Sequence, residues 1–386
     1  MDIQDVDVLV IGAGAIGLSI AWELAKLGRD VIVLEREAHV GSVQSARNSG
    51  VIHAGIYYEP GSWKARTCKT EHFYEFCRTY GVPHKQTGNL IVARTMDELE
   101  VLGSLERQAA LNGVKDCLLL GGAGVRKYEP NIQALAALYD SVSGIVDVAS
   151  YVVTLKRLCQ GLGVIILTKT NVDRIFLDTF PVVHATEASG NELYIRPKIL
   201  VNAAGLDAAR IARMVNPGNP WNYALTRGEY VSFNMRKRSD LALQGHLIYP
   251  IPCVYQGSDG KEYTSLGIHL TPTFQINGHG EYEVGPTILI GPSAKPVHDA
   301  LDYEKDRYPI RHFIDRVSQF FSTLQEEDCE LSYSGIVARF AAPHRDFVIE
   351  KDSLFPNCIH LVGIDSPGLT ASLAIGEEVS KLAHSI

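Results

Sequence analysis

The chain has 386 residues, more than one hydrophobic core usually serves, so its length predicts two domains. Hydrophobic residues make up 46% and charged residues 21%, as in ordinary globular proteins. The formal net charge of -8 argues against nucleic acid or an anionic membrane as a partner.

The amino-acid sequence has no segment typical of targeting or metal binding. No apolar run approaches the ~20 residues of a membrane span, and the acidic start MDIQDVD resembles neither a signal nor a transit peptide. Seven scattered cysteines without a C-x-x-C pair predict reduced thiols and no metal site. We therefore expect a cytoplasmic protein, with peripheral membrane association left open.

The clearest local pattern lies in residues 6–36. An apolar, mostly β-branched run at 6–11 predicts a buried strand, apolar residues at helical spacing at 16–27 predict a helix, and residues 31–34 predict a second strand. Between the first strand and the helix stands G-x-G-x-x-G, which permits a tight turn, a close approach of a pyrophosphate and helix–strand packing. The helix N-terminus offers unpaired N–H groups to phosphates.

This order of elements predicts a dinucleotide site, because it supplies the context that a lone glycine triplet lacks. Glu35 stands at the end of the second strand, where a carboxylate accepts hydrogen bonds from an adenosine ribose. The motif residues expected to contact the dinucleotide are Gly12, Ala13, Gly14, Ala15, Ile16, Gly17, Glu35 and Arg36.

Residues 42–49 carry little charge and many small polar side chains, directly beyond this motif. A polar surface connection is the ordinary alternative, but the position favours a loop that faces a ligand. The side chains expected to do so are Ser45, Arg47, Asn48 and Ser49.

The middle of the chain alternates between two patterns. Residues 88–94 predict a strand, 97–112 a helix and 125–130 a turn; α/β character then returns with a helix at 151–162. Further strands are expected at 164–167, 172–175 and 199–205, the last of which enters a turn of small residues.

The last 170 or so residues become rich in β structure and then return to α/β. Strands at 228–234, 246–251, 263–270 and 283–291 predict an antiparallel sheet with one face toward a ligand. A helix, or two helices broken at Pro309, is expected over 303–324 on its other side. A strand at 358–362, a Pro/Gly turn and a helix at 369–383 close the chain.

The predicted fold class is α/β, α+β overall: a Rossmann-type nucleotide-binding domain with a discontinuous, mainly antiparallel substrate domain. The expected nucleotide-binding domain comprises residues 1–82, 145–215 and 330–386. Residues 83–144 and 216–329 form the expected substrate-binding domain.

A family resemblance rests on RNSGVIHAGIYY at residues 47–58. It resembles N-S-G-V-I-H-x-G-I-Y-Y of the L-2-hydroxyglutarate dehydrogenases and oxidases, FAD enzymes within the D-amino-acid-oxidase/glycine-oxidase superfamily. Supporting segments are GNLIVA at 88–93, GIVD at 144–147, RGEY at 227–230 and GIHLTP at 267–272. The resemblance implies FAD as the cofactor and oxidation of an L-2-hydroxy acid, a small carboxylate, to the 2-oxo acid.

It also implies further cofactor contacts. In similar flavoproteins, a backbone segment like that around Val172 meets the adenine, a turn like that at Ala203 and Gly205 passes the dinucleotide, and a helix N-terminus approaches the flavin, where it stabilises negative charge. The residues expected there are Gly335, Pro367, Gly368, Leu369 and Thr370.

Oxidation of a hydroxy acid by hydride transfer to flavin N5 requires a base for the alcohol proton and cations for the carboxylates. The candidate bases are His53 and His269, since a neutral imidazole accepts a proton near pH 7. Arg339 and Arg227 are the candidate carboxylate partners. Hydroxyl groups of Tyr57, Tyr58, Tyr230 and Tyr249 are candidate donors to the substrate.

Three departures from the family pattern leave the substrate open. Arg47 stands where those enzymes commonly have histidine, GIDSPGLTAS at 363–372 stands where they read close to N-A-P-S-P-A-A-T-S-S, and GIVAR at 335–339 replaces G-V-R-A-Q. The alternatives are an FAD-dependent amino-acid or secondary-amine oxidase, or a dinucleotide-binding protein without turnover. The residues do not distinguish O₂, a quinone or a carrier protein as electron acceptor.

Overall fold

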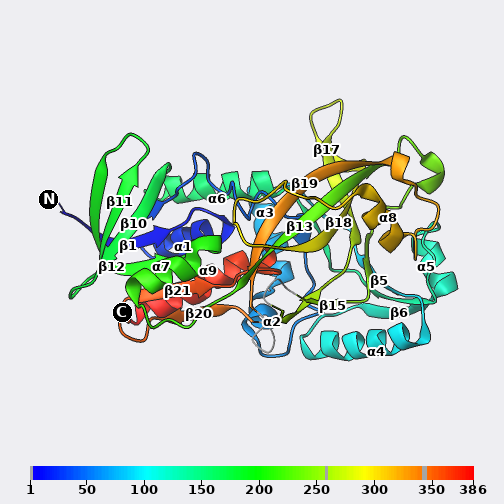
Figure 1. Cartoon of the computed structure of the whole chain (residues 1–386), viewed down its shortest axis with the longest axis horizontal. Helices are drawn as coiled ribbons and strands as arrows, with labels where there is room; N and C mark the ends of the chain where they lie inside the picture. Colours follow the sequence, from blue (N-terminus) through cyan, green and yellow to red (C-terminus); the bar gives the residue numbers. More distant parts are fainter. Residues whose placement is uncertain (1–2, 257–259, 341–345) are drawn as a thin grey trace.

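The computed structural model describes residues 3–256, 260–340 and 346–386. Two large sheets lie side by side along an elongated molecule, and both ends of the chain lie beside the first sheet (Figure 1). The small three-stranded and two-stranded sheets complete the strands described.

The first sheet has a parallel centre in the order β12-β1-β2-β9, extended by the antiparallel β10–β11 hairpin; β21 also pairs with the end of β12. Its strands are β1 (Ile3–Ile11), β2 (Val31–Leu34), β9 (Ile165–Leu167), β10 (Thr170–Phe176), β11 (Val182–Glu187), β12 (Glu192–Asn202), β20 (Val348–Lys351) and β21 (Cys358–Val362).

Helices cover both faces of this sheet, which is why its strands are apolar on both sides. One face packs on α1 (Ala15–Lys26), α3 (Thr70–Tyr80), α6 (Val148–Gly161) and α9 (Gly368–His384). The other face packs on α7 (Ala208–Val215). The carboxyl ends of β1 and β12 therefore emerge between layers, where ligands bind in such sheets.

The second sheet is mainly antiparallel, in the order β19-β13-β18-β17-β14-β5-β7-β6. Its strands are β5 (Asn89–Ala93), β6 (Cys117–Gly121), β7 (Ala136–Asp140), β13 (Ala224–Asn234), β14 (Leu247–Pro250), β17 (His269–Ile276), β18 (Tyr282–Val297) and β19 (Cys329–Arg339). Helices α5 (Gly122–Tyr128) and α8 (Ile310–Val317) pack on one part of it, and α4 (Met96–Leu111) on another.

Short elements join these parts. They are α2 (Trp63–Thr67), β3 (Val51–Ile52), β4 (His84–Gln86), β8 (Gly144–Val146), β15 (Cys253–Gln256), β16 (Glu262–Ser265) and the 3₁₀ turns Gly205–Asp207, Ser239–Leu241 and Glu326–Asp328. Within the described ranges, no helix combines the length and apolarity needed to cross a membrane.

The predicted α/β fold class with an antiparallel second sheet is confirmed, including β2 at its expected bounds and α9 to within one residue. Four local predictions are wrong. The helix expected over 303–324 is only α8, the turn expected at 125–130 is largely α5, and the strand expected at 263–270 is divided between β16 and β17. Strand β19 belongs to the second sheet, although residues from 330 onward were assigned to the nucleotide-binding domain.

The turn between β1 and α1 leaves no room for side chains. A Cβ at Gly12, whose φ is +104°, would lie 2.4 Å from the carbonyl oxygen of Ala203, and one at Gly17 would lie 1.9 Å from that of Gly12. Glycine is therefore required at both positions for the helix to pack against the strand ends.

Gly17→Ala should lower the free energy of unfolding by about 2 kcal/mol or more, because the added methyl group must displace backbone. Gly103→Ala is the matched control, since Gly103 is also helical and its Cβ would meet only the end of Arg107, at 3.6 Å. The control should gain about 0.5–1 kcal/mol from helix propensity. Denaturant unfolding measures both, and equal effects would contradict the packing argument.

Candidate functional site

A cavity of about 740 Å³ runs from the β1–α1 turn to the inner face of the second sheet. It brings together residues expected from the nucleotide motif and residues expected to act on a substrate. Those lining it are Gly12, Gly14, Ala15, Ile16, Glu35, Arg36, Ser45, Arg47, Asn48, Ser49, His53, Tyr57, Val172, Ala203, Gly205, Tyr230, Tyr249, His269, Gly335, Arg339, Pro367, Gly368 and Leu369.

The start of α1 is open toward this cavity. Its N-cap, Gly14, has no side chain, and apart from the Ala15 amide no first-turn N–H group bonds to a side chain among the described residues, so N–H groups remain for a ligand. Nearby polar contacts order the turn: the Ala15 amide donates to Ser45 Oγ over 3.0 Å, and the Ala13 amide donates to Glu35 Oε2 over 2.8 Å. Glu35 is thereby fixed at the end of β2 with its carboxylate on the cavity.

The end of this cavity at the first sheet has the features of an adenosine site. Val172 supplies an apolar wall beside the small residues Ala203 and Gly205. Arg36 is held by Asp207 at 2.6 Å, so its charge is already paired. A tight turn that requires glycine, a helix N-terminus on the cavity and a carboxylate at the end of the second strand together fit a dinucleotide.

Residues 41–49 form a loop of successive turns that is bonded to strand β19 of the second sheet. Arg47 donates through Nη1 to the Ser334 carbonyl over 3.0 Å and stacks on the Tyr303 ring, 4.1 Å from its centroid. Tyr333 donates its hydroxyl to the Asn48 carbonyl over 2.7 Å. The loop is thus positioned by β19 and the segment before α8.

Three of the residues expected to contact the cofactor do not line the cavity. Ala13 and Gly17 lie within the packed turn. Thr370 is buried in α9, where its Oγ1 accepts from the His53 amide at 3.0 Å and donates to the Val51 carbonyl at 3.4 Å. Thr370 therefore fastens the segment that carries His53 to α9, whose N-cap Pro367 makes no side-chain cap among the described residues.

His269 is the better-defined candidate base. Its ring stacks on Tyr249 with centroids 3.9 Å apart, and its Nδ1 lies 3.0 Å from the Gly267 carbonyl, which can only accept a hydrogen bond. The proton of the neutral ring is therefore on Nδ1, and Nε2 keeps its lone pair. That atom is buried and has no hydrogen-bond partner among the described residues.

Burial keeps both candidate bases neutral. It lowers the pKa of His269 to about 3 and that of His53 to about 4, the latter partly opposed by the negative charge of Asp365. Burial also raises the pKa of Tyr57 and Tyr249 above the ordinary range, so their hydroxyl groups stay protonated. Neutral imidazoles and protonated tyrosines are the forms that accept and donate hydrogen bonds to a substrate.

Two cations meet one carboxylate at the same end of the cavity. Lys64 Nζ lies 2.5 Å from Asp365 Oδ1, and Arg339 Nε lies 3.4 Å from Asp365 Oδ2. All three side chains line the cavity, although only Arg339 was expected there. Lys64 was missed because nothing in the local pattern of α2 marks it. Asp365 was not named as a site residue, although the turn at 363–368 that contains it had been noted as a departure from the family pattern.

The family model for FAD-dependent oxidoreductases, DAO, matches residues 7–382. The chain belongs to this family of FAD-dependent oxidoreductases, and its cofactor is FAD. It is 30% identical to mitochondrial L-2-hydroxyglutarate dehydrogenase of Arabidopsis thaliana, over 98% of this chain and 83% of that protein. It is 31% identical to glycerol 3-phosphate dehydrogenase of Caloramator mitchellensis, over 98% and 74%.

Among solved structures, the chain is similar to the dithionite-reduced L-α-glycerophosphate oxidase of Mycoplasma pneumoniae with FAD bound. The TM-score is 0.81 at 25% identity, covering 100% of this chain and 95% of that one. The resemblance inferred from residues 47–58 is confirmed by these relatives.

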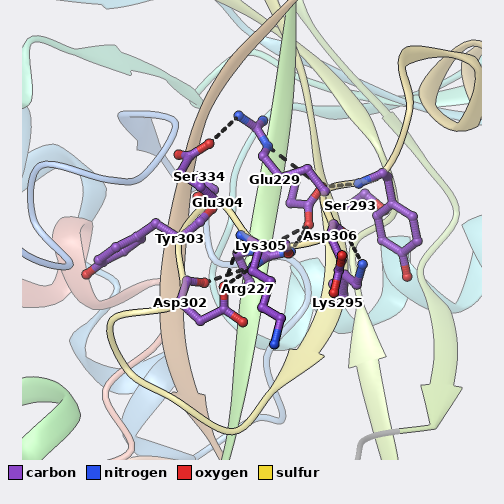
Figure 2. Close-up of polar contacts among 12 residues, drawn as sticks. Arg227, Glu229, Ser293, Lys295, Asp302, Tyr303, Glu304, Lys305, Asp306 and Ser334 are labelled. Carbon is purple, nitrogen blue, oxygen red and sulfur yellow. Dashed lines mark hydrogen bonds and ion pairs between the residues drawn. The ribbon is translucent and has the colours of Figure 1, made fainter.

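The structure corrects the expectation for Arg227 in this oxidoreductase. Thr226, Gly228 and Tyr230 of β13 face the cavity, whereas Arg227 points to the opposite face and is fully buried. Figure 2 shows its guanidinium among acidic and carbonyl groups: Glu229 Oε1 at 2.7 Å, Asp302 Oδ1 at 2.8 Å and the Lys305 carbonyl at 2.5 Å. Side chains alternate along a strand, so Arg227 holds the segment before α8 and does not reach a substrate in the cavity.

Arg227→Met should reduce the free energy of unfolding by about 3–5 kcal/mol, because the buried Glu229 would lose its nearer cation and keep only Arg307 Nε, 3.9 Å away. Arg196→Met is the control, since Arg196 and its partner Asp5 are both exposed at the surface and their pairing should matter far less. Chemical denaturation of the holoenzyme measures both. A stable Arg227→Met enzyme with only a raised KM would restore the substrate-binding role.

Proposed function

We propose that this oxidoreductase converts an L-2-hydroxy acid to the 2-oxo acid, with L-2-hydroxyglutarate as the first compound to test. One observation carries the proposal: the cavity that begins at the nucleotide turn ends among two neutral imidazoles and the Arg339 cation. Oxidation of a hydroxy acid removes a hydride from carbon and a proton from oxygen. FAD, when bound at the nucleotide turn, would supply the acceptor for the hydride.

The residues at this end of the cavity would bind the substrate carboxylate, accept the hydroxyl proton and orient the substrate. Arg339 presents a guanidinium suited to a carboxylate, with Lys64 as a second cation. His269 offers the lone pair on Nε2 to the hydroxyl proton, and His53 is the alternative base. Tyr57, Tyr230 and Tyr249 line the same end, where their hydroxyl groups orient the substrate.

A phosphate ester is the second candidate, because a relative and a structural neighbour are named for glycerol phosphate. That substrate also carries a hydroxyl group on the carbon that would lose the hydride. Lys64 and Arg339 have the side-chain types that bind phosphate groups. An amine oxidation on the same fold is the third, and it needs less help from a base because a neutral amine supplies its own lone pair.

Anaerobic titration separates these substrates. The purified yellow enzyme should lose its visible flavin absorbance with an L-2-hydroxy acid and keep it with the D-enantiomer. The panel should include sn-glycerol 3-phosphate, L- and D-amino acids and sarcosine. Bleaching by an amine alone would overturn the proposal, and so would a colourless protein that takes up no FAD.

The bases give a second test. His269→Asn should reduce kcat/KM for the hydroxy acid about 10²- to 10⁴-fold, and His53→Asn serves as the parallel variant that shows which imidazole takes the proton. Because the pKa values of both imidazoles lie near 3 to 4, kcat/KM should persist as the pH falls through 6.5 and decline only when the rings protonate. An acid limb centred near pH 6.5 would contradict a buried neutral base.

A further inference from the structure

We propose that the ion pair between Arg36 and Asp207 closes the nucleotide end of the cavity and slows the release of FAD. The inference rests on the FAD cofactor and is independent of the substrate named in the proposed function. It gives a role to Asp207, a residue that was not expected at the site from the sequence.

The ion pair spans the carboxyl end of β1. In the first sheet, β1 lies between two parallel neighbours, and its last residue, Ile11, is in register with Asn202 of β12 and Leu34 of β2. Arg36 follows β2 by two residues, and Asp207 stands in the 3₁₀ turn after β12. Arg36 Nη1 lies 2.6 Å from Asp207 Oδ2. The pair therefore joins the segments on both sides of β1, where the glycine turn begins.

Both side chains stand at the boundary of the cavity. Arg36 and Asp207 line it together with Glu35, the carboxylate at the end of β2. They also retain 43% and 29% of their exposure, so the pair lies at a rim and not in the protein core. A side-chain bridge at this rim blocks a path by which the adenosine half of a bound dinucleotide could leave.

Each partner is held in position independently of FAD. The Glu37 amide donates to Glu35 Oε1 over 2.8 Å, which orders the residues on either side of Arg36. On the other side, Arg210 Nε donates to Asp207 Oδ1 over 3.2 Å, so a second arginine fixes the carboxylate that Arg36 meets. Opening this end of the cavity therefore requires the ion pair to break.

The effect of Asp207 distinguishes a closure from simple electrostatics. The diphosphate of FAD is negatively charged, so Coulomb attraction alone predicts that loss of Arg36 weakens FAD binding and that loss of the Asp207 charge strengthens it. A closure that needs both partners predicts faster release from either variant. The two explanations therefore give opposite expectations for a change at Asp207.

The test measures how fast FAD leaves the holoenzyme. FAD-loaded protein is diluted in the presence of a phosphodiesterase that hydrolyses released FAD to FMN and AMP, and the fluorescence of the FMN reports the rate. Arg36→Met and Asp207→Asn should each release FAD about 2- to 5-fold faster than the wild type, as expected for a partly exposed ion pair. The double variant should be no faster than the faster single variant, because the same interaction is lost once.

Asp7→Asn is the matched control. Asp7 pairs with Arg29 at 3.0 Å, with exposures of 20% and 32%, at the amino-terminal end of the β1–β2 pairing. Neither residue lines the cavity. The control should release FAD within about 1.5-fold of the wild-type rate, because its ion pair is equally modest and lies away from the nucleotide.

Three results would overturn the inference. They are release from Asp207→Asn at or below the wild-type rate, multiplied effects in the double variant, and flavin that stays with the denatured protein, since a covalent link would then retain the cofactor. Asp207→Ser replaces Asp207→Asn in the cycle if the latter does not fold. The release rate does not depend on which substrate bleaches the flavin, so the proposed function stands or falls separately.

Discussion

The site depends on how closely β19 crosses the loop at residues 41–49. A Cβ at Gly335 would lie 2.0 Å from the Arg47 carbonyl oxygen, so the two backbones touch with no side chain between them. Hydrogen bonds from Arg47 and to Asn48 fix the same crossing. Because the first sheet carries this loop and the second sheet carries β19, the contact joins the nucleotide turn to the substrate end in one cavity. A side chain at 335 would separate the sheets and open the cavity to water.

Strand β13 uses its two faces for different purposes. Thr226, Gly228 and Tyr230 line the cavity, while Arg227 and Glu229 are fully buried on the other face and hold the segment before α8. Tyr308 donates its amide to Glu229 over 2.7 Å. Ser334 donates its hydroxyl to the Tyr303 carbonyl over 2.5 Å (Figure 2). The segment thereby places Tyr303 under Arg47. A buried ion cluster of this kind stabilises the fold only when every partner is present.

The sequence predicted those elements and site residues that are determined by a local pattern. Strand, glycine turn, helix and acid are close together in the chain, so β1, β2 and α1 were expected, and so were cavity residues such as Glu35, Ser45 and Arg47. The sequence could also have predicted which way the Arg227 side chain points. Arg227 and Tyr230 are three residues apart on one strand, and the alternation of side chains places them on opposite faces. The pairing of Lys64, Arg339 and Asp365 could not be predicted, because it joins positions that only the tertiary fold brings together. The irregular segment before α8 was mistaken for helix because its ordering comes from Arg227 rather than from apolar spacing.

The burial that keeps the imidazoles neutral also determines how strongly a fixed charge acts in this cavity. A low effective dielectric lowers the pKa of His53 and His269 and, by the same physics, lengthens the reach of the Asp365 carboxylate. An exposed acid such as Glu59 is screened by water and has no comparable effect on a ligand. A substrate carboxylate without a cationic partner would raise the pKa of His269 and favour its protonated form, which cannot accept the hydroxyl proton. Pairing of the substrate carboxylate with Arg339 and neutrality of the base would therefore be coupled, because both groups line the same buried end of the cavity.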